Sequence, residues 1–237
     1  MWNEKFHFLF SYLCNMEEKT KTSLMACPLF DQIAGDEIES IMESIHYKTI
    51  RFSKGDIIIL AGIPCRYADI VITGSLICSM AALSGKQIEV SRLSSGNMIA
   101  PAYLFSQNHA MPVSVKADNK VELLRISKEN FKLLTDNNLQ IRSNFIRLLS
   151  DINVFLTGEI RVLSLYTVRE KVAHLLRKLV KEQGSSFIHL DRSRQEIAQS
   201  FGIQKFSLLR VLSQLEKEGA IRIAGKDIQI IDLKLIR

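Results

Sequence analysis

The sequence predicts an α+β protein built from an N-terminal antiparallel β-roll, a long helix and a C-terminal winged helix-turn-helix. Short Ile- and Val-rich runs, separated by Gly or Ser-Gly turns, fill residues 46–127, which is typical of an antiparallel barrel or sandwich. Helical apolar periodicity follows over residues 137–165. A serine capping box, a glycine turn and a β-hairpin then occur between residues 191 and 232.

The 237 residues are enough for two modest domains, and changes of periodicity divide them further. Before the strands, apolar positions from Leu29 to Ile45 fit helical faces that break near Gly35, and Asp36 is the expected N-cap of the second face. We therefore expect an N-terminal leader at 1–26, a sensor domain at 27–136, a dimerisation helix at 137–165 and a winged helix-turn-helix domain at 166–237.

The expected helix at 137–165 carries two apolar stripes. The first recurs at alternating steps of four and three, is interrupted by Glu159, and comprises Ile141, Phe145, Leu148, Ile152, Phe155 and Val162. The second lies beside it and comprises Ile146, Leu149, Leu156, Ile160 and Leu163. We take the first as the seam of a homodimer. One stripe would face the roll and the other a partner helix, although a single wide stripe inside a monomer fits the pattern as well.

The helix-turn-helix is predicted from local signals. Ser193 and Glu196 form a capping box, Gly202 supplies the turn, and a second helix follows from about residue 204 to residue 218. On that helix four apolar residues share one face at i, i+3, i+4 and i+7, namely Leu208, Val211, Leu212 and Leu215.

The opposite face of the second helix carries the side chains expected to contact DNA bases. Arg210 can make a bidentate contact to guanine, and Phe206 and Lys205 lie beside it. Lys205 is also placed to contact a phosphate. A hairpin follows, with Lys226 in its turn. The expected phosphate contacts are Arg194, Gln195, Ser207 and Lys226.

Charge is distributed unevenly along the chain. Residues 161–237 hold 15 Lys and Arg against 8 Asp and Glu, whereas residues 1–160 hold 16 against 17. A basic C-terminal part behind a nearly neutral N-terminal part predicts double-stranded DNA as the partner of the C-terminal part alone.

Several function classes are disfavoured. The four cysteines (14, 27, 65 and 78) lie far apart, and no His or Cys cluster has metal-ligand spacing. No phosphate loop or nucleophile–base pairing is evident, so we expect no enzyme, no metal and no cofactor. No apolar run approaches the roughly 20 residues of a membrane span, so we expect a cytoplasmic protein without membrane contact.

The order of parts resembles the Crp/Fnr family of bacterial regulators over roughly residues 27–237. The most specific match is Ser193-Arg194-Gln195-Glu196-Ile197-Ala198-Gln199, followed by Gly219–Ile230, and the glycines at 55, 62, 74 and 96 match the turns of the family's cyclic-nucleotide-binding roll. The resemblance implies a homodimeric transcription regulator that contacts RNA polymerase and responds to a small-molecule effector.

Two departures from the family pattern matter. Where the family's recognition helix usually carries Arg-Glu-Thr/Ser and then Arg, this chain has Lys205-Phe206-Ser207 and then Arg210, so its operator should differ. An aromatic side chain cannot accept a hydrogen bond from cytosine, but it can contact a thymine methyl.

The second departure lies in the sensor. The family's Gly-Glu-Leu and Arg-Ser segments, which hold ribose and phosphate in members that bind cyclic AMP, correspond here to Ala100-Pro101-Ala102 and to Met111-Pro112. A phosphate buried without a cation is costly, so cyclic nucleotide is disfavoured. His109 or Lys116 could still supply a charge. We expect an effector pocket at these five positions for another small molecule, or a roll that is only a scaffold.

The sequence thus predicts a homodimeric DNA-binding transcription regulator of the Crp/Fnr type that responds to a small effector other than cyclic AMP. The alternative is an interaction protein that uses the cyclic-nucleotide-type domain and the long helix without binding DNA. The basic C-terminal segment argues against this alternative.

Overall fold

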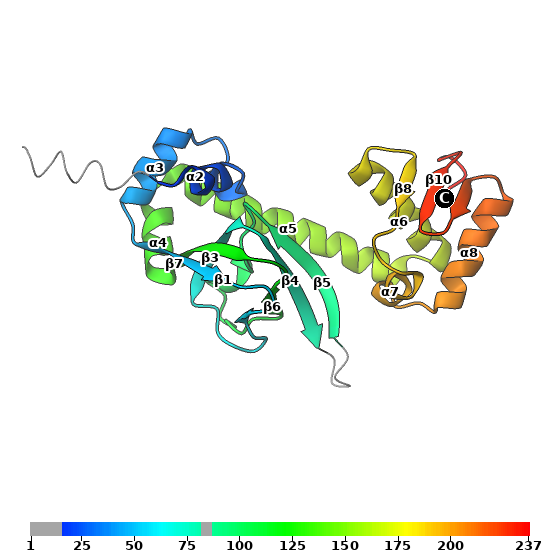
Figure 1. Cartoon of the computed structure of the whole chain (residues 1–237), viewed down its shortest axis with the longest axis horizontal. Coiled ribbons are helices and arrows are strands. Elements are labelled where there is room, and N and C mark those ends of the chain that lie inside the picture. The colour runs from blue at the N-terminus through cyan, green and yellow to red at the C-terminus, as the bar shows by residue number, and fades with distance from the viewer. Residues whose placement is uncertain (1–15, 82–86) are drawn as a thin grey trace, which may run out of the picture. The chain divides into compact units, whose positions relative to one another are not determined.

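The chain forms two compact units, Met1–Ile152 and Asn153–Arg237, and each has its own apolar core. The computed structural model describes residues 16–81 and 87–237 (Figure 1). The boundary between the units falls inside the long helix α5 (Leu139–Leu165).

The first unit begins with two helices, α2 (Glu18–Met25) and α3 (Gly35–Glu43), joined by the 3-10 turn η1 (Pro28–Phe30). Leu24 of α2 is fully buried in the core, and the Ser23 hydroxyl donates to the Val71 carbonyl at 2.7 Å and accepts from the Gly96 amide at 3.1 Å. Residues 18–25 of the expected leader therefore belong to the first unit.

Helix α3 starts earlier than expected. Its N-cap is Ala34, not Asp36, and no side chain caps it. Asp36 lies in the first turn instead, where a carboxylate still interacts favourably with the positive end of the helix dipole.

The roll consists of two antiparallel sheets, as predicted (Figure 1). One has the order β1-β7-β3 and the other β2-β6-β4-β5. The 3-10 turn η2 (Pro101–Tyr103) precedes β6. The strands are β1 (Tyr47–Phe52), β2 (Ile57–Ile59), β3 (Tyr67–Thr73), β4 (Ser75–Ala81), β5 (Gln87–Ser94), β6 (Ser114–Ala117) and β7 (Val121–Ser127).

One predicted turn glycine has a demonstrable steric role. Gly74 joins β3 to β4 at φ 86°, and a Cβ there would lie 2.3 Å from the Lys120 carbonyl oxygen. A side chain at this position would clash with the backbone of the neighbouring turn, in addition to the cost of the left-handed conformation.

A buried carboxylate fastens α2 to the roll. Glu122 of β7 is 5% exposed and accepts from the Lys19 ammonium at 2.5 Å and from the Arg51 Nε at 3.1 Å. The hydrogen bond from Lys19 is the main cause that lowers the pKa of Glu122 below its ordinary value of 4.5, and Arg51 adds to it. Glu122 therefore joins α2, β1 and β7 through charge-assisted hydrogen bonds.

Helix α4 (Lys128–Asn137) follows β7, and the Ser127 hydroxyl caps it by accepting from the Asn130 amide. Phe131 of α4 meets Phe145 of α5 with ring centroids 5.1 Å apart, and Phe105 lies 6.0 Å from both. This aromatic cluster packs the N-terminal part of α5 into the first core.

The expected seam on α5 is wrong for three of its six residues. Ile141 and Phe145 are buried in the core of the first unit, and Val162 is buried in the core of the second. They cannot face a partner, because their own unit already covers them. Leu148 and Ile152 are half-buried and Phe155 is exposed.

The second unit has the predicted winged layout. Helix α6 (Val168–Gln183) is followed by strand β8 (Phe187–His189), helix α7 (Arg194–Ser200), helix α8 (Lys205–Lys217), strand β9 (Ile221–Ala224) and strand β10 (Asp227–Ile230), and the sheet order is β8-β10-β9. Within residues 16–81 and 87–237, no helix is both long and apolar enough to cross a membrane.

The Glu122 cluster makes a prediction about stability and pH. We expect Glu122→Gln to lower the free energy of unfolding by about 1–2 kcal/mol at pH 7, because two hydrogen bonds to a charged group are weakened. Since folding lowers the pKa of Glu122, its contribution is present above pH 4.5 and is lost as the pH falls through the folded-state pKa.

Urea unfolding followed by circular dichroism, repeated between pH 7 and pH 3, measures this difference. Glu43→Gln, at an exposed glutamate of α3, is the control and should unfold like the wild type. A deficit for Glu122→Gln that stays constant over the whole pH range would contradict the assignment.

Candidate DNA interface and ligand pocket

The start of α7 is fixed by the predicted capping box. The Ser193 hydroxyl accepts from the Glu196 amide at 3.2 Å, and the Glu196 carboxylate accepts from the Ser193 amide at 2.7 Å. These two bonds satisfy backbone donors that have no partner within the helix. The hydrogen bond from the Ser193 amide is the main cause that lowers the pKa of Glu196, and it keeps the carboxylate at the positive end of α7.

The turn between α7 and α8 is held by hydrogen bonds to α7 and to α6. Gly202 adopts φ 63°, and the Ile203 amide donates to the Ala198 carbonyl at 2.9 Å. From α6, the buried Lys171 ammonium donates to the Phe201 carbonyl at 3.2 Å. This places a cation at the C-terminal end of α7, which the helix dipole favours. Sequence reasoning missed Lys171, because its partner lies 30 residues away.

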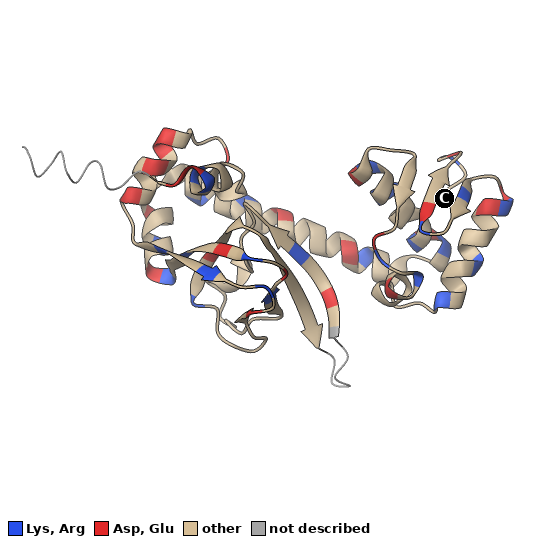
Figure 2. Ribbon diagram, in the orientation of Figure 1, with Lys and Arg blue, Asp and Glu red and all other residues tan. Residues whose placement is uncertain are grey.

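Helix α8 has the predicted division into faces. Leu208, Val211, Leu212 and Leu215 are all buried in the second core. On the opposite side Phe206 is 76% exposed, Arg210 and Ser213 are exposed, and Lys205 occupies the first turn. Figure 2 shows the Lys and Arg positions as blue bands along α8. The three expected base-contacting side chains are thus all exposed on α8, with Phe206 and Arg210 one turn apart on the same face.

The four residues expected to contact phosphate differ from one another in exposure and in hydrogen-bond partners. Gln195 and Lys226 are exposed and Ser207 is half-buried. Arg194 is half-buried, and its Nη2 donates to the Gly225 carbonyl at 2.8 Å, so it ties α7 to the turn of the wing. Burial lowers the pKa of the Arg194 guanidinium from its ordinary value. Arg194 therefore has a structural partner that sequence reasoning did not predict.

The far end of α8 is anchored to α6. Both Nη atoms of Arg169 donate to the Glu218 carboxylate, at 3.0 Å and 2.6 Å. The two parallel hydrogen bonds fix the orientation of the Glu218 carboxylate relative to the Arg169 guanidinium, and so they hold the C-terminus of α8 against α6. The hydrogen bond from Arg169 is the main cause that lowers the pKa of Glu218.

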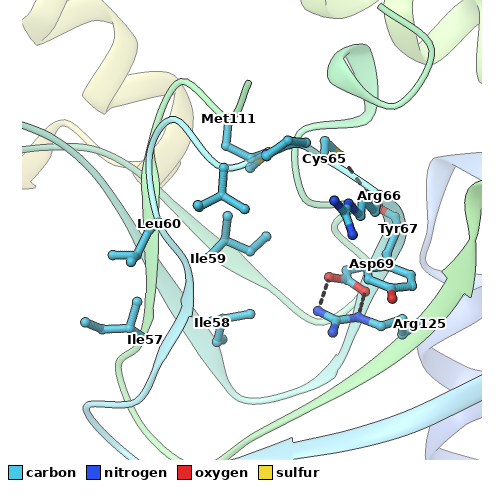
Figure 3. A pocket seen from close by; sticks show the side chains of 12 residues that line it. Ile57, Ile58, Ile59, Leu60, Cys65, Arg66, Tyr67, Asp69, Met111 and Arg125 are labelled. Carbon is cyan, nitrogen blue, oxygen red and sulfur yellow. Dashed lines mark hydrogen bonds and ion pairs between the residues drawn. The ribbon is translucent and has the colours of Figure 1, made fainter. Parts of the chain in front are cut away.

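The roll contains a cavity of about 640 Å³, a volume typical of small-molecule sites (Figure 3). At one side Arg125 donates from Nε and Nη2 to the two Asp69 oxygens, each at 2.7 Å. The lining comes from β2, the loop after it, β3, the segment before β6, and β7, and comprises Ile57, Ile58, Ile59, Leu60, Ile63, Pro64, Cys65, Arg66, Tyr67, Asp69, Met111 and Arg125.

Of the five expected effector-pocket residues, Met111 alone lines this cavity. Pro101 is buried, Ala102 is exposed and Pro112 is half-buried. Ala100 caps η2 in a left-handed conformation at φ 44°, which is strained for a residue with a side chain. The predicted set is therefore dispersed, and the Asp69–Arg125 pair at the cavity was not predicted.

The cysteines form no metal site in the described residues. Cys27, Cys65 and Cys78 are free and buried, and burial raises the pKa of each thiol, to about 11 for Cys27. Cys14 lies outside the described residues. No group of three or more His, Cys, Asp or Glu side chains in residues 16–81 and 87–237 could hold a metal ion.

Comparisons with known families match both units. The family model described as the Crp-like helix-turn-helix domain matches residues 170–237, and the cyclic nucleotide-binding domain matches residues 49–138. The first match contains α7, α8 and the wing, and the second contains the cavity.

Curated relatives are similar over most of the chain. The cAMP-activated global transcriptional regulator CRP of Klebsiella aerogenes is 28% identical over 168 residues, which cover 68% of this chain and 78% of the relative. The cAMP-activated regulator Vfr of Pseudomonas aeruginosa is 25% identical over 189 residues, which cover 76% and 88%. These relatives are regulators of transcription.

Solved structures share the fold. FixK2 from Bradyrhizobium japonicum superposes with a TM-score of 0.60 at 15% identity, covering 81% of this chain and 96% of its own. A mutant of CooA from Carboxydothermus hydrogenoformans gives 0.62 at 18% identity, covering 80% and 86%. At this level of identity the likeness concerns the fold alone.

The Lys171 contact makes a prediction about the helix-turn-helix. We expect Lys171→Met to destabilise the second unit by about 1–3 kcal/mol, because the methionine fills the space but leaves the Phe201 carbonyl without its donor. Lys181→Met, at an exposed lysine on the same helix, is the matched control.

Thermal unfolding followed by circular dichroism, together with the affinity for duplex DNA, tests this role. The Lys171 variant should lose both stability and affinity, whereas the Lys181 variant should keep its stability. Equal melting temperatures for the two variants would show that the contact does not hold the turn.

Proposed function

Since the chain belongs to the Crp/Fnr family of DNA-binding transcription regulators, we propose that it acts as a homodimer whose two α8 helices contact one operator. The exposed outer face of α8 carries this proposal, because Arg210 and the 76% exposed Phe206 project from a helix whose other face is buried. Such a helix is suited to lie in the major groove, where each base pair presents a distinct pattern.

Arg210 supplies the polar base contact in this proposal. Its guanidinium can donate two parallel hydrogen bonds to guanine O6 and N7. Arg210 lies one turn beyond Phe206 on the same face, so both side chains would meet neighbouring base pairs. Phe206 would contact a thymine methyl, the apolar group of the major groove.

Phosphate contacts would set the position of the protein without selecting sequence. Lys226 in the wing turn and Gln195 at the start of α7 are exposed and suited to this role. Lys205 occupies the first turn of α8, near the positive end of the helix dipole, so we assign it to a phosphate contact. Arg194 would act indirectly, by holding the wing turn.

The dimer would form through the second stripe on α5 rather than the one first expected. Ile146, Leu156 and Ile160 are 59%, 50% and 63% exposed. Together with Leu149, Asn153 and Leu163 they repeat at alternating steps of three and four along the 27-residue helix. A single asparagine in such a seam is a feature that fixes the register and number of paired helices.

The effector is proposed to be a small molecule other than cyclic AMP. The positions that correspond to the ribose and phosphate contacts of the family hold Pro101 and Met111, and neither side chain carries charge. We further propose that the regulator acts in the cytoplasm and contacts RNA polymerase, as its resemblance to the family implies. An interaction protein that does not bind DNA is the alternative, and the exposed basic face of α8 disfavours it.

We expect Arg210→Ala to lose about 1–3 kcal/mol of binding free energy on the selected operator and to relax the preference at one base pair. Selection of duplexes from a random pool, followed by titration of the best site and of random DNA, measures both effects. Equal losses on the operator and on random DNA would contradict a base contact.

Lys205→Ala is the comparison variant in the same titration. It should weaken the operator and random DNA alike and reduce the slope of log K against log salt by about 0.9, the value for one phosphate contact. A wild-type protein that binds no duplex DNA at low salt would instead support the interaction protein.

The α5 stripe makes a separate prediction. We expect Ile160→Asp to yield monomers of 26.9 kDa, because a carboxylate would be buried in an apolar seam, whereas the wild type should scatter light as a particle of twice that mass. Val154→Asp is the matched control, since Val154 is 71% exposed on α5 but lies outside the stripe. A dimeric Ile160→Asp protein would remove the stripe as the interface.

A further inference from the structure

The cavity in the roll has two chemically different walls (Figure 3). Ile57, Ile58, Ile59 and Leu60 line one side with aliphatic groups, and Ile63 is a further aliphatic residue of the lining. The facing side carries Arg66, Tyr67 and Asp69 from β3 and the segment before it, and Arg125 from β7. A ligand that fills this space would need an aliphatic body and one polar end.

The aliphatic wall is more exposed than a core wall. Ile57, Leu60 and Ile63 are 60%, 51% and 54% exposed, although they are neighbours in space around one cavity. Strand β2 is an outermost strand of its sheet, so in the described structure no further strand covers its outer edge. Apolar side chains gathered in this way are typical of a binding surface.

The acid at the polar side is already neutralised. Both Asp69 oxygens accept from Arg125, and the Asp69 side chain is only 2% exposed. The Arg125 guanidinium also stacks on the Tyr67 ring, 4.6 Å from its centroid. Asp69 is therefore committed to Arg125 and cannot offer a free carboxylate to a cationic ligand.

Arg66 leaves an excess of positive charge. Within the part of the chain that the structure describes, the exposed Arg66 guanidinium has no ion-pair or hydrogen-bond partner. The lining holds two arginines against one aspartate, a net charge of +1. Burial raises the pKa of the Cys65 thiol, so Cys65 stays neutral and adds no negative charge.

We propose that this cavity binds an amphipathic monoanion of the aliphatic carboxylate class, with its chain along Ile57–Leu60 and Ile63 and its carboxylate on Arg66. A guanidinium matches a carboxylate by two parallel hydrogen bonds, and the volume of about 640 Å³ accommodates a medium-length chain. Ala100, Pro101, Ala102 and Pro112 do not line the cavity, so the site differs from the one expected from sequence.

The aliphatic carboxylate would be the effector of the proposed regulator. The effect of this ligand on DNA binding rests on the proposed function, whereas its binding to the cavity does not. Binding itself is tested on the full-length protein with two probes of equal chain length, octanoate and octan-1-ol. Isothermal titration calorimetry and the shift in melting temperature report the affinity of each probe.

We expect octanoate to bind the wild type about 10-fold more tightly than octan-1-ol, and Arg66→Gln to remove that advantage while leaving octan-1-ol unchanged. Ile63→Ser should weaken both probes by about 10-fold, because both chains lose the same apolar contact. Lys120→Gln removes an exposed positive charge outside the cavity and should leave both affinities as in the wild type.

Failure of octanoate to bind at millimolar concentration would overturn the proposal, as would equal affinities for the two probes or an Arg66→Gln protein that keeps its preference for octanoate. Duplex DNA binding is measured on the same samples. Intact DNA binding without octanoate binding would refute this site alone, whereas octanoate binding without DNA binding would refute the proposed regulator alone.

Discussion

The packing of one face of α8 into the core of the second unit determines everything that this helix can present to DNA. Because Leu208, Val211, Leu212 and Leu215 are buried, the helix cannot rotate without exposing them. The direction of Phe206 and Arg210 follows from that burial. Lys171 and Arg169 add polar constraints at the two ends, one on the turn before α8 and one on its last residues. The burial of the apolar face of α8 thus determines which side chains its opposite face presents to solvent.

The same principle explains what α5 leaves free. Its N-terminal part is drawn into the first core by the contact of Phe145 with Phe131, and Val162 is drawn into the second. Each core takes side chains from one sector of the helix, and the remaining apolar sector runs from Ile146 to Leu163. An exposed apolar sector on a 27-residue helix is costly unless something covers it. A second copy with the same sector is the occupant we propose.

These cases show what the sequence could and could not predict. The helix-turn-helix was predicted closely, because a capping box, a glycine turn and an apolar face are all encoded within a few residues. Both stripes on α5 are visible in the sequence, but Ile141 and Phe145, which we expected to face a partner helix, are buried in the core of the first unit. The periodicity of apolar residues predicts which of them share a helix face. What packs against that face depends on the positions of Phe131 and Phe105 in the fold. Local pattern carries no information on that placement.

The pairing of charged side chains at the cavity also could not be predicted from local sequence patterns. Arg125 and Asp69 are 56 residues apart and meet only because β7 pairs with β3. The roll has another buried acid, Glu122, which lies on β7. Glu122 has two cationic partners, Lys19 and Arg51, and its bond to Lys19 fastens α2 to the roll. Asp69 has one partner, and Arg66 stands beside that pair without an acid of its own. The two sites differ in what lies beside them: α2 contributes Lys19 to the Glu122 cluster, whereas the Asp69 pair lines an aliphatic cavity. An unmatched cation at the mouth of an apolar space is what an amphipathic anion requires, and neither Arg66 nor Ile63 suggests this in sequence alone.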